Sequence, residues 1–242
     1  MNSISQTVPI SAPQAVFFDW DGTLADSFKF LYAAHLHVHN RLSMEPFSLE
    51  AFEGYFGGPR EKLYTEIYGE RREEAKTQFE SYVLENHLGG FEAMPGTHDL
   101  IDILRRKGIP AGVVSNKKAN LITAEIRHMG WDDVFSAIVG AGEAKEDKPS
   151  PAPLLLAFER GGITAPRTAI WYVGDKDTDI LCAKAAGCVA VFIENDTEQA
   201  HVKRAFSPEL SFKNCREFGD FLLQYPSSVL QQSCDEPSPR AL

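Results

Sequence analysis

The sequence predicts an α/β fold: a doubly wound, mostly parallel Rossmann-like sheet with a small all-helical cap domain inserted after the first strand. Two observations predict this class. Short apolar segments rich in β-formers alternate with helical segments from residue 97 onward, and the block between residues 26 and 94 shows helical spacing only. The expected division is an N-terminal tail (1–14), a core domain (15–25 and 95–225), the cap domain (26–94) and a flexible C-terminal tail (226–242).

The first expected element is a strand over residues 15–19, "AVFFD", after which Gly22 allows a tight turn. Asp26 is predicted as the N-cap of the next helix, because a carboxylate accepts hydrogen bonds from the first free N–H groups of a helix. The cap domain follows. Its apolar residues recur at helical spacing in three segments, namely Phe28, Leu31, Tyr32 and Leu36, then Leu63, Tyr64, Ile67 and Tyr68, then Phe79, Tyr82 and Val83.

Beyond Met94, strands and helices alternate. Thr97 is the predicted N-cap of a helix that ends at Gly108, and a buried strand then leads into Ser115. The remaining elements are expected as helix 121–130, strand 135–140, helix 151–162, strand 168–174, helix 178–187, strand 188–193 and a last helix over 215–225. In such a sheet, ligands bind beyond the carboxyl ends of the strands.

Composition excludes several classes of protein. The 242 residues are 43% hydrophobic, which is enough for a sizeable core, and the formal net charge of -10 argues against a partner such as a nucleic acid or an anionic membrane. The four cysteines form no CxxC pair, the first residues lack the features of a signal peptide, and no apolar run approaches membrane-spanning length. We therefore expect a cytoplasmic protein.

Polar residues follow three of the predicted strands. The first strand ends in Asp19, with Asp21 just beyond it, Ser115 and Asn116 lie at the end of the second, and Asp175 and Asp179 follow the fourth, while Lys148 lies at the entry to a helix. Hard oxygen ligands select Mg²⁺, which together with a lysine would neutralise a phosphoryl group that a carboxylate attacks. The set predicts phosphoryl transfer.

The segments "FFDWDGTLADS", "VVSNK", "DKPSP" and "VGDKDTDI" resemble, in this order, the four motifs of the haloacid dehalogenase-like hydrolases. The resemblance is to phosphatases with a helical cap after the first motif, such as phosphoglycolate phosphatases, and spans residues 15 to 222. It implies a Mg²⁺-dependent phosphatase that hydrolyses a small phosphorylated metabolite, 2-phosphoglycolate first, through an aspartyl-phosphate.

The resemblance also implies a role for each motif residue. Asp19 would be the nucleophile, Asp21 the general acid and base, and Lys148 the balancing cation. The implied Mg²⁺ ligands are Asp19, the backbone carbonyl of Asp21 and Asp175, with Asp179 in the outer shell. The implied phosphate-binding residues are Ser115, Asn116, Gly22 and Thr23.

Three features remain open. Trp20 and Lys176 depart from the usual motif residues, and Lys176 would either repel Mg²⁺ or hold a substrate anion. Arg60, in "GGPREK", either grips a carboxylate or second phosphate of the substrate or is a solvated arginine. His35 and His39 lie one helical turn apart, but no third zinc ligand is evident nearby.

Two alternative functions also fit. The first is a sugar-phosphate phosphatase or phosphomutase of the same capped type. A mutase must shield its aspartyl-phosphate from water until it is returned to a second sugar hydroxyl, which depends on closure of the cap. The second is a non-catalytic phospho-accepting or regulatory protein, although such a protein would be expected to lack at least one of the carboxylates. The sequence leaves the oligomeric state unknown.

Overall fold

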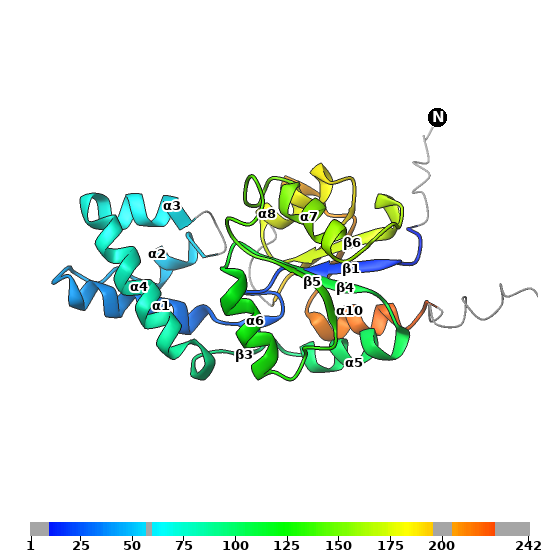
Figure 1. The fold of residues 1–242 in the computed structure, drawn as a ribbon, viewed down its shortest axis with the longest axis horizontal. Helices are drawn as coiled ribbons and strands as arrows, with labels where there is room; N and C mark the ends of the chain where they lie inside the picture. The colour runs from blue at the N-terminus through cyan, green and yellow to red at the C-terminus, as the bar shows by residue number, and fades with distance from the viewer. Residues whose placement is uncertain (1–9, 57–59, 196–204, 226–242) are drawn as a thin grey trace, which may run out of the picture.

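The central sheet consists of parallel strands in the order β5-β4-β1-β6-β7-β8. Figure 1 labels β1, β4, β5 and β6 of this sheet. The sheet is seen in a computed structural model that describes residues 10–56, 60–195 and 205–225. The strands are β1 (Ala15–Phe18), β4 (Ala111–Val114), β5 (Phe135–Val139), β6 (Ile170–Gly174), β7 (Val189–Ile193) and β8 (Leu210–Phe212). The strand order reverses at β1, so that β1 lies between β4 and β6 and its carboxyl end lies at the switch point.

Helices cover both faces of this sheet. One face packs against α5 (Thr97–Lys107), α6 (Ala119–His128) and α10 (Cys215–Leu222), and the other packs against α7 (Ala152–Arg160) and α8 (Asp177–Ala185) (Figure 1). β1 supplies both faces: Val16 and Phe18 belong to the first hydrophobic cluster, and Ala15 and Phe17 to the second. This burial on both sides explains why β1 is apolar throughout. The predicted α/β class is confirmed.

The predicted strands and helices of the sheet are present, and two details differ. The short strand β8 was not predicted, because three residues are too few to show a period. Thr97 is not the N-cap of α5; that position is held by Gly96 at φ +83°, where a Cβ atom would lie 2.6 Å from the backbone nitrogen of Arg216. The close packing of α5 against α10 therefore requires glycine at this position.

The segment between β1 and α5 forms a separate helical unit with its own hydrophobic cluster (Figure 1). Its members include Phe30, Phe52, Tyr64 and Phe79. The unit contains α1 (Phe28–Arg41), α2 (Leu49–Glu53), α3 (Arg60–Leu63), the π-helical turn η1 (Tyr64–Tyr68), the 3-10 turn η2 (Gly69–Arg71), α4 (Arg72–Asn86) and the 3-10 turn η3 (His87–Gly89).

A two-stranded antiparallel ribbon connects this unit to the rest of the molecule. β2 (Ala25–Asp26) pairs with β3 (Glu92–Ala93), so the chain enters and leaves the helical unit side by side. Asp26 is therefore not the N-cap of α1: it lies in the ribbon with its side chain exposed, and Ser27 holds the N-cap position. The Ser27 hydroxyl donates to Asp21 instead of capping the helix.

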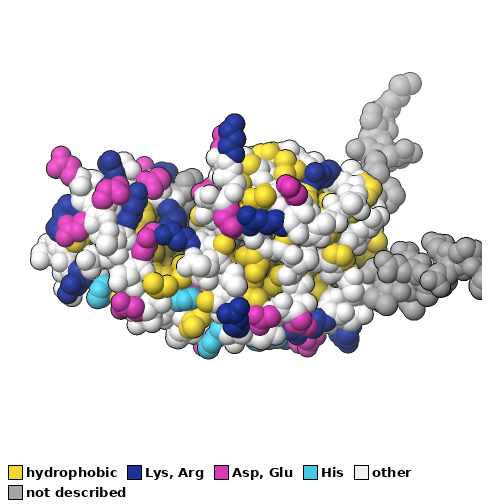
Figure 2. All heavy atoms as spheres, in the orientation of Figure 1, with side chains coloured by type: hydrophobic (Ala, Val, Ile, Leu, Met, Phe, Trp, Pro, Cys, Tyr) yellow, Lys and Arg dark blue, Asp and Glu magenta, His cyan; other side chains and the backbone are white. Residues whose placement is uncertain are grey.

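Among the described helices, none has the length and hydrophobicity needed to cross a bilayer. On the face seen in Figure 2, basic and acidic side chains are interspersed. The predicted C-terminal tail and residues 1–9 of the N-terminal tail lie outside the described residues.

Candidate active site

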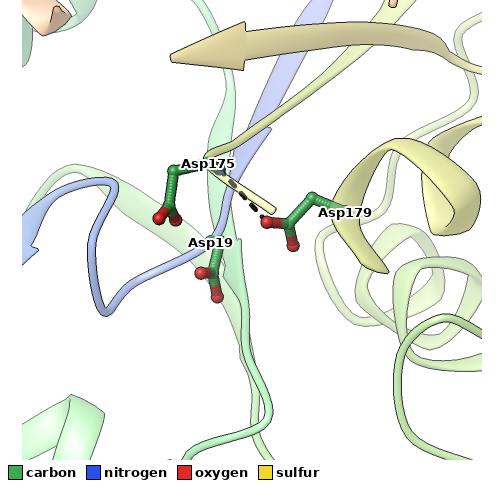
Figure 3. Close-up of side chains that lie close together, drawn as sticks. All are labelled: Asp19, Asp175 and Asp179. Atoms are coloured by element: carbon green, nitrogen blue, oxygen red, sulfur yellow. Dashed lines mark hydrogen bonds between the residues drawn. The ribbon is translucent and has the colours of Figure 1, made fainter. Parts of the chain in front are cut away.

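Three aspartates converge at the carboxyl edge of the sheet (Figure 3). Asp19 directly follows β1, Asp175 directly follows β6, and Asp179 lies in the first turn of α8. All three side chains are buried, and one carboxylate oxygen from each lies within 4.8 Å of the other two. Since residues from two neighbouring parallel strands meet here, the predicted juxtaposition of residues 19 and 175 is present in the fold.

Lys148 supplies the positive charge in this cluster. Its Nζ donates to Asp19 Oδ1 and to Asp179 Oδ1, each at 2.7 Å, and the lysine side chain is only 3% exposed. Burial alone would lower the pKa of Lys148, but the carboxylates of Asp179 and Asp19 raise it above its usual value. Lys148 is therefore a permanent cation beside Asp19.

Burial has the opposite effect on the acids. It raises the pKa of Asp19 to about 7, because Lys148 offsets only part of the cost of burying the charge, while Asp179 and Asp175 add repulsion. Burial likewise raises the pKa of Asp175 to about 6 against the attraction of Lys176. The three carboxylates carry more negative charge than Lys148 and Lys176 together neutralise when all are ionised, which favours a further cation.

The two aspartates after β6 are held differently. Asp179 Oδ2 accepts from the backbone N–H groups of Asp175, at 3.2 Å, and Lys176, at 3.0 Å. Because Asp179 Oδ1 already binds Lys148, both of its oxygens are engaged, as expected for a residue that orients its neighbours. Asp175 Oδ1 accepts from the Thr23 hydroxyl at 3.0 Å.

Gly22 brings the turn after β1 close to Asp175. Its φ of +87° suits glycine, and a Cβ atom there would lie 2.6 Å from Asp175 Oδ2. The Gly22 carbonyl also accepts from the Asn195 side chain. The turn that carries Gly22 and Thr23 therefore shapes the space around the Asp175 carboxylate.

Ser115 and Asn116 follow β4 at the same edge. Ser115 is 6% exposed, and its Oγ accepts a long hydrogen bond of 3.4 Å from the Lys117 amide. The Asn116 side chain binds the backbone of Lys148 twice: Nδ2 donates to the carbonyl at 3.2 Å, and Oδ1 accepts from the amide at 3.1 Å. Asn116 therefore fixes the segment that carries Lys148, a function that the sequence did not indicate.

Asp21 lies in a network that sequence reasoning missed. Its Oδ1 accepts from Ser27 Oγ at 2.5 Å and from Lys117 Nζ at 3.0 Å. Lys117 also donates to the buried Glu125 on α6, at 2.7 Å. Burial opposes the charge of Lys117, but Asp21 and Glu125 together raise its pKa above the usual value.

Lys176 was expected either to repel Mg²⁺ or to hold a substrate anion. In the structure its ammonium has two neighbours. Its Nζ lies 3.5 Å from Asp175 Oδ2 and 5.5 Å from the centre of the Phe56 ring in the helical unit. The Lys176 ammonium thus partly neutralises the Asp175 carboxylate, and it also lies close to Phe56 of the helical unit across the site.

A cavity of about 220 Å³ extends from the aspartates into the helical unit. Asp19, Asp21, Ser115, Asn116 and Lys148 line its inner end. Its outer walls are mainly aromatic and aliphatic, formed by residues such as Leu31, Phe52, Phe56, Leu63, Tyr64, Phe79 and Leu121. A phosphoryl group at the aspartates would therefore carry its leaving group toward the helical unit.

Arg60 lines the same cavity. Its guanidinium lies over the rings of Tyr64 and Phe79, at 5.8 and 5.7 Å, and 3.7 Å from Glu80 Oε1. Glu80 is also bound by Lys118, at 2.7 Å. Arg60 therefore faces the cavity, and its positive charge is partly neutralised by Glu80 on α4.

The two histidines of α1 are bound within the aromatic cluster. His35 Nδ1 pairs with the Tyr68 hydroxyl at 2.9 Å, and His39 Nδ1 pairs with the Glu45 carbonyl at 2.6 Å. Burial, together with the charges of Arg60 and His39, lowers the pKa of His35 to about 3. Within the described residues, the one group of acids, histidines and cysteines close enough to bind a metal is the aspartate trio, so zinc at His35 and His39 has no support.

The donors at the sheet edge fit a hard divalent cation. They are buried carboxylate oxygens, and such oxygens are the ligands that Mg²⁺ prefers. Burial has raised the pKa values of Asp19 and Asp175. Both oxygens of Asp179 accept hydrogen bonds. Within the described residues, Asp19 and Asp175 each accept a hydrogen bond at Oδ1, and Asp175 Oδ2 lies 3.5 Å from the Lys176 ammonium, so the Oδ2 atoms of Asp19 and Asp175 are the more available ligands.

Comparisons with known proteins give matches in family, sequence and fold. A family model described as haloacid dehalogenase-like hydrolase matches residues 16–193. A phosphoglycolate phosphatase of Neisseria meningitidis is 37% identical over 187 residues, covering 74% of this chain and 79% of that protein. A pyrophosphatase of Bacillus velezensis is 26% identical, covering 81% of this chain and 89% of that protein.

Solved structures share the fold. A haloacid dehalogenase-like hydrolase from Bacteroides fragilis superposes with a TM-score of 0.78 at 23% identity, covering 85% of this chain and 99% of that one. At this identity the likeness concerns the fold alone.

Proposed function

Since the chain belongs to the haloacid dehalogenase-like hydrolases and is a phosphatase, we propose that it hydrolyses a small phosphomonoester through an aspartyl-phosphate on Asp19, with Mg²⁺ as cofactor. One observation carries this proposal: Asp19 lies buried at the sheet edge, bound by Lys148 and grouped with two further carboxylates.

In the proposed reaction, an Asp19 carboxylate oxygen attacks phosphorus in line with the ester oxygen. Lys148 stays bound to Asp19 and Asp179 and offsets the negative charge that the phosphoryl group brings. Ser115 and the Asn116 backbone would hydrogen-bond the phosphoryl oxygens, while the Asn116 side chain holds Lys148 in place.

Asp21 is the proposed general acid and base. It first donates a proton to the leaving ester oxygen, and its carboxylate then takes a proton from the water that attacks the aspartyl-phosphate. Asp21 lines the cavity together with Asp19, as both roles require.

The proposed Mg²⁺ ligands are Asp19, the backbone carbonyl of Asp21 and Asp175. When bound, the ion would neutralise charge on the phosphoryl oxygens and lower the repulsion between phosphate and carboxylate. Thr23 and Gly22 hold and shape the surroundings of Asp175, and Asp179 holds Lys148 and the backbone.

For the substrate, we propose 2-phosphoglycolate first, because several relatives bear the name phosphoglycolate phosphatase. Arg60 is the proposed contact for its carboxylate. Inorganic pyrophosphate enters as a second candidate, because one relative is a pyrophosphatase.

The test is a phosphate-release screen over small phosphomonoesters and pyrophosphate, with Mg²⁺ or with EDTA. We expect turnover with Mg²⁺, none with EDTA, and none from Asp19→Asn, whose amide cannot act as the nucleophile. Phosphate release by a folded Asp19→Asn protein would contradict the mechanism, and release in EDTA would contradict the cofactor.

A further inference from the structure

Glu125 is a buried acid that the proposed reaction does not use. Its side chain is 1% exposed although it carries a carboxylate, and fully buried acids are rare unless they are paired. Glu125 is not among the residues that line the cavity, so it does not contact the substrate there.

Three polar side chains from separate parts of the chain meet at this carboxylate. The Trp20 indole Nε1 donates to Oε2 at 2.6 Å, and Lys117 Nζ donates to the same oxygen at 2.7 Å. His87 Nδ1, from η3 at the end of the helical unit, lies 2.9 Å from Oε1. Trp20, which departs from the usual motif residue, thus has a specific polar partner.

The network ends on Asp21. Lys117 Nζ bridges the two acids, 2.7 Å from Glu125 and 3.0 Å from Asp21. Within the described part of the chain, both polar contacts of the Asp21 carboxylate, from Lys117 and from Ser27, are made at Oδ1. A carboxylate held at one oxygen presents the other for proton transfer.

We propose that Glu125 is a positioning residue: it fixes Lys117, and through Lys117 it orients Asp21 so that Oδ2 carries the transferred proton. The proposal rests on the proposed function of Asp21. As the bond between an Asp19 oxygen and phosphorus forms, the bond from phosphorus to the ester oxygen breaks. The ester oxygen keeps the electron pair and receives the proton from Asp21 Oδ2.

Two esters of nearly the same size isolate this step. The leaving group of p-nitrophenyl phosphate departs readily as its anion, whereas the far more basic leaving group of phenyl phosphate needs the proton. Because the two esters differ only in the nitro group, a change in the ratio of their kcat/KM values between protein variants reports assistance by Asp21 and not the fit of the substrate.

The experiment measures kcat/KM for both esters with the full-length protein, Mg²⁺ and the variant Glu125→Gln. We expect the value for phenyl phosphate to fall by about tenfold or more, part of the roughly 10² to 10⁴ that a positioned acid supplies, while that for p-nitrophenyl phosphate changes by less than about threefold. Asp21→Asn should shift the ratio in the same direction and further.

Controls separate this role from a general loss of structure. Glu74→Gln makes the same chemical change in an exposed ion pair with Arg71, and it should leave the ratio unchanged. If Glu125→Gln does not fold, as judged by circular dichroism, Lys117→Met breaks the same link between the two acids and should shift the ratio likewise.

If kcat/KM fell equally for both esters, or if the ratio of the two kcat/KM values stayed unchanged in a folded variant, the positioning role would be overturned and Glu125 would be a structural residue. Absence of phosphate release from either ester by the wild type would instead refute the proposed function.

Discussion

At the scale of single residues, the candidate site follows from the cost of burying charge. The positions of Asp19, Asp175 and Asp179 were predictable because these residues stand in short motifs directly after strands. The carboxyl ends of parallel strands lie at the same edge of the sheet, so the three side chains meet there. Lys148 lies far from Asp19 in sequence; the sequence pattern placed it at the start of a helix and in the same set of polar residues, and its role as the balancing cation came from the family resemblance.

Glu125 and Lys117 were missed for different reasons. Lys117 stands inside the quoted motif "VVSNK", but a lysine next to a strand is most often exposed. Glu125 follows Ile122 by three residues and precedes Ile126, both of which are buried. An acid at an apolar position of a helix was therefore the available signal, and its partners come from segments that only the fold brings together.

Arg60 gives a prediction at this scale. Arg60→Met keeps the length of the side chain over Tyr64 and Phe79 but removes the charge. If Arg60 binds the carboxylate of the substrate, KM for 2-phosphoglycolate should rise by about tenfold, the order expected for a lost charge-assisted hydrogen bond. KM for p-nitrophenyl phosphate, which has no carboxylate, should change little. Steady-state kinetics on both esters measures this, and equal changes in KM would make Arg60 a structural residue.

At the scale of the element, the turn after β1 leads to a second prediction. In Gly22→Ala, the new methyl group would displace the Asp175 carboxylate, 2.6 Å away, in addition to straining a backbone at φ +87°. We expect kcat/KM to fall by at least about tenfold, as when the surroundings of a metal ligand are disturbed.

Gly142→Ala is the matched control for the strain. Gly142 has φ +77°, but a Cβ atom there meets nothing within 4 Å, so both variants carry a strain of about 1–2 kcal/mol. Thermal denaturation should therefore show a loss of stability in both variants, larger in Gly22→Ala because of its contact with Asp175, whereas activity should fall in Gly22→Ala alone. A comparable loss of activity in both variants would assign the effect to strain.

Elements were predicted best where their pattern is long. The buried strands and amphipathic helices of the sheet match, because burial on one or two faces dictates their composition. The ribbon of β2 and β3 was missed, since two residues carry no period. The caps of α1 and α5 were misassigned because tertiary contacts decided them: Ser27 binds Asp21, and Gly96 packs against Arg216.

At the scale of the whole molecule, the aspartates link stability to pH and to Mg²⁺. The pKa values of Asp19 and Asp175, about 7 and about 6, exceed the ordinary value of 3.8, so the folded protein binds more protons than the unfolded chain between those limits. Without metal, this contribution to stability is complete below about pH 4 and is lost as the pH rises through about 7.

The prediction is that Mg²⁺ stabilises the protein more at about pH 8 than at about pH 5, where protons compete for the same oxygens. With Mg²⁺ at about a hundred times its Kd, the Tm should rise by roughly 5 to 10 °C at the higher pH. Thermal denaturation with Mg²⁺ or with EDTA at both pH values measures this. Asp19→Asn should show a smaller rise, and a rise independent of pH would argue against metal binding by these carboxylates.

The fold class was predictable at this scale because alternating strands and helices bury their apolar faces when the strands form one sheet and the helices cover both of its sides. The cavity was not predictable, since its walls combine side chains from the helical unit with others from the loops after β1 and β4.

The ribbon of β2 and β3 has an evolutionary consequence. Because Ala25 pairs with Ala93 and Asp26 with Glu92, a short reverse turn could join the two strands after deletion of everything between them, with the sheet topology untouched. Insertions of another size or shape could be grafted at the same junction. The residues that act on phosphorus could then stay constant, while replacement of the inserted unit changes which metabolite the cavity accepts.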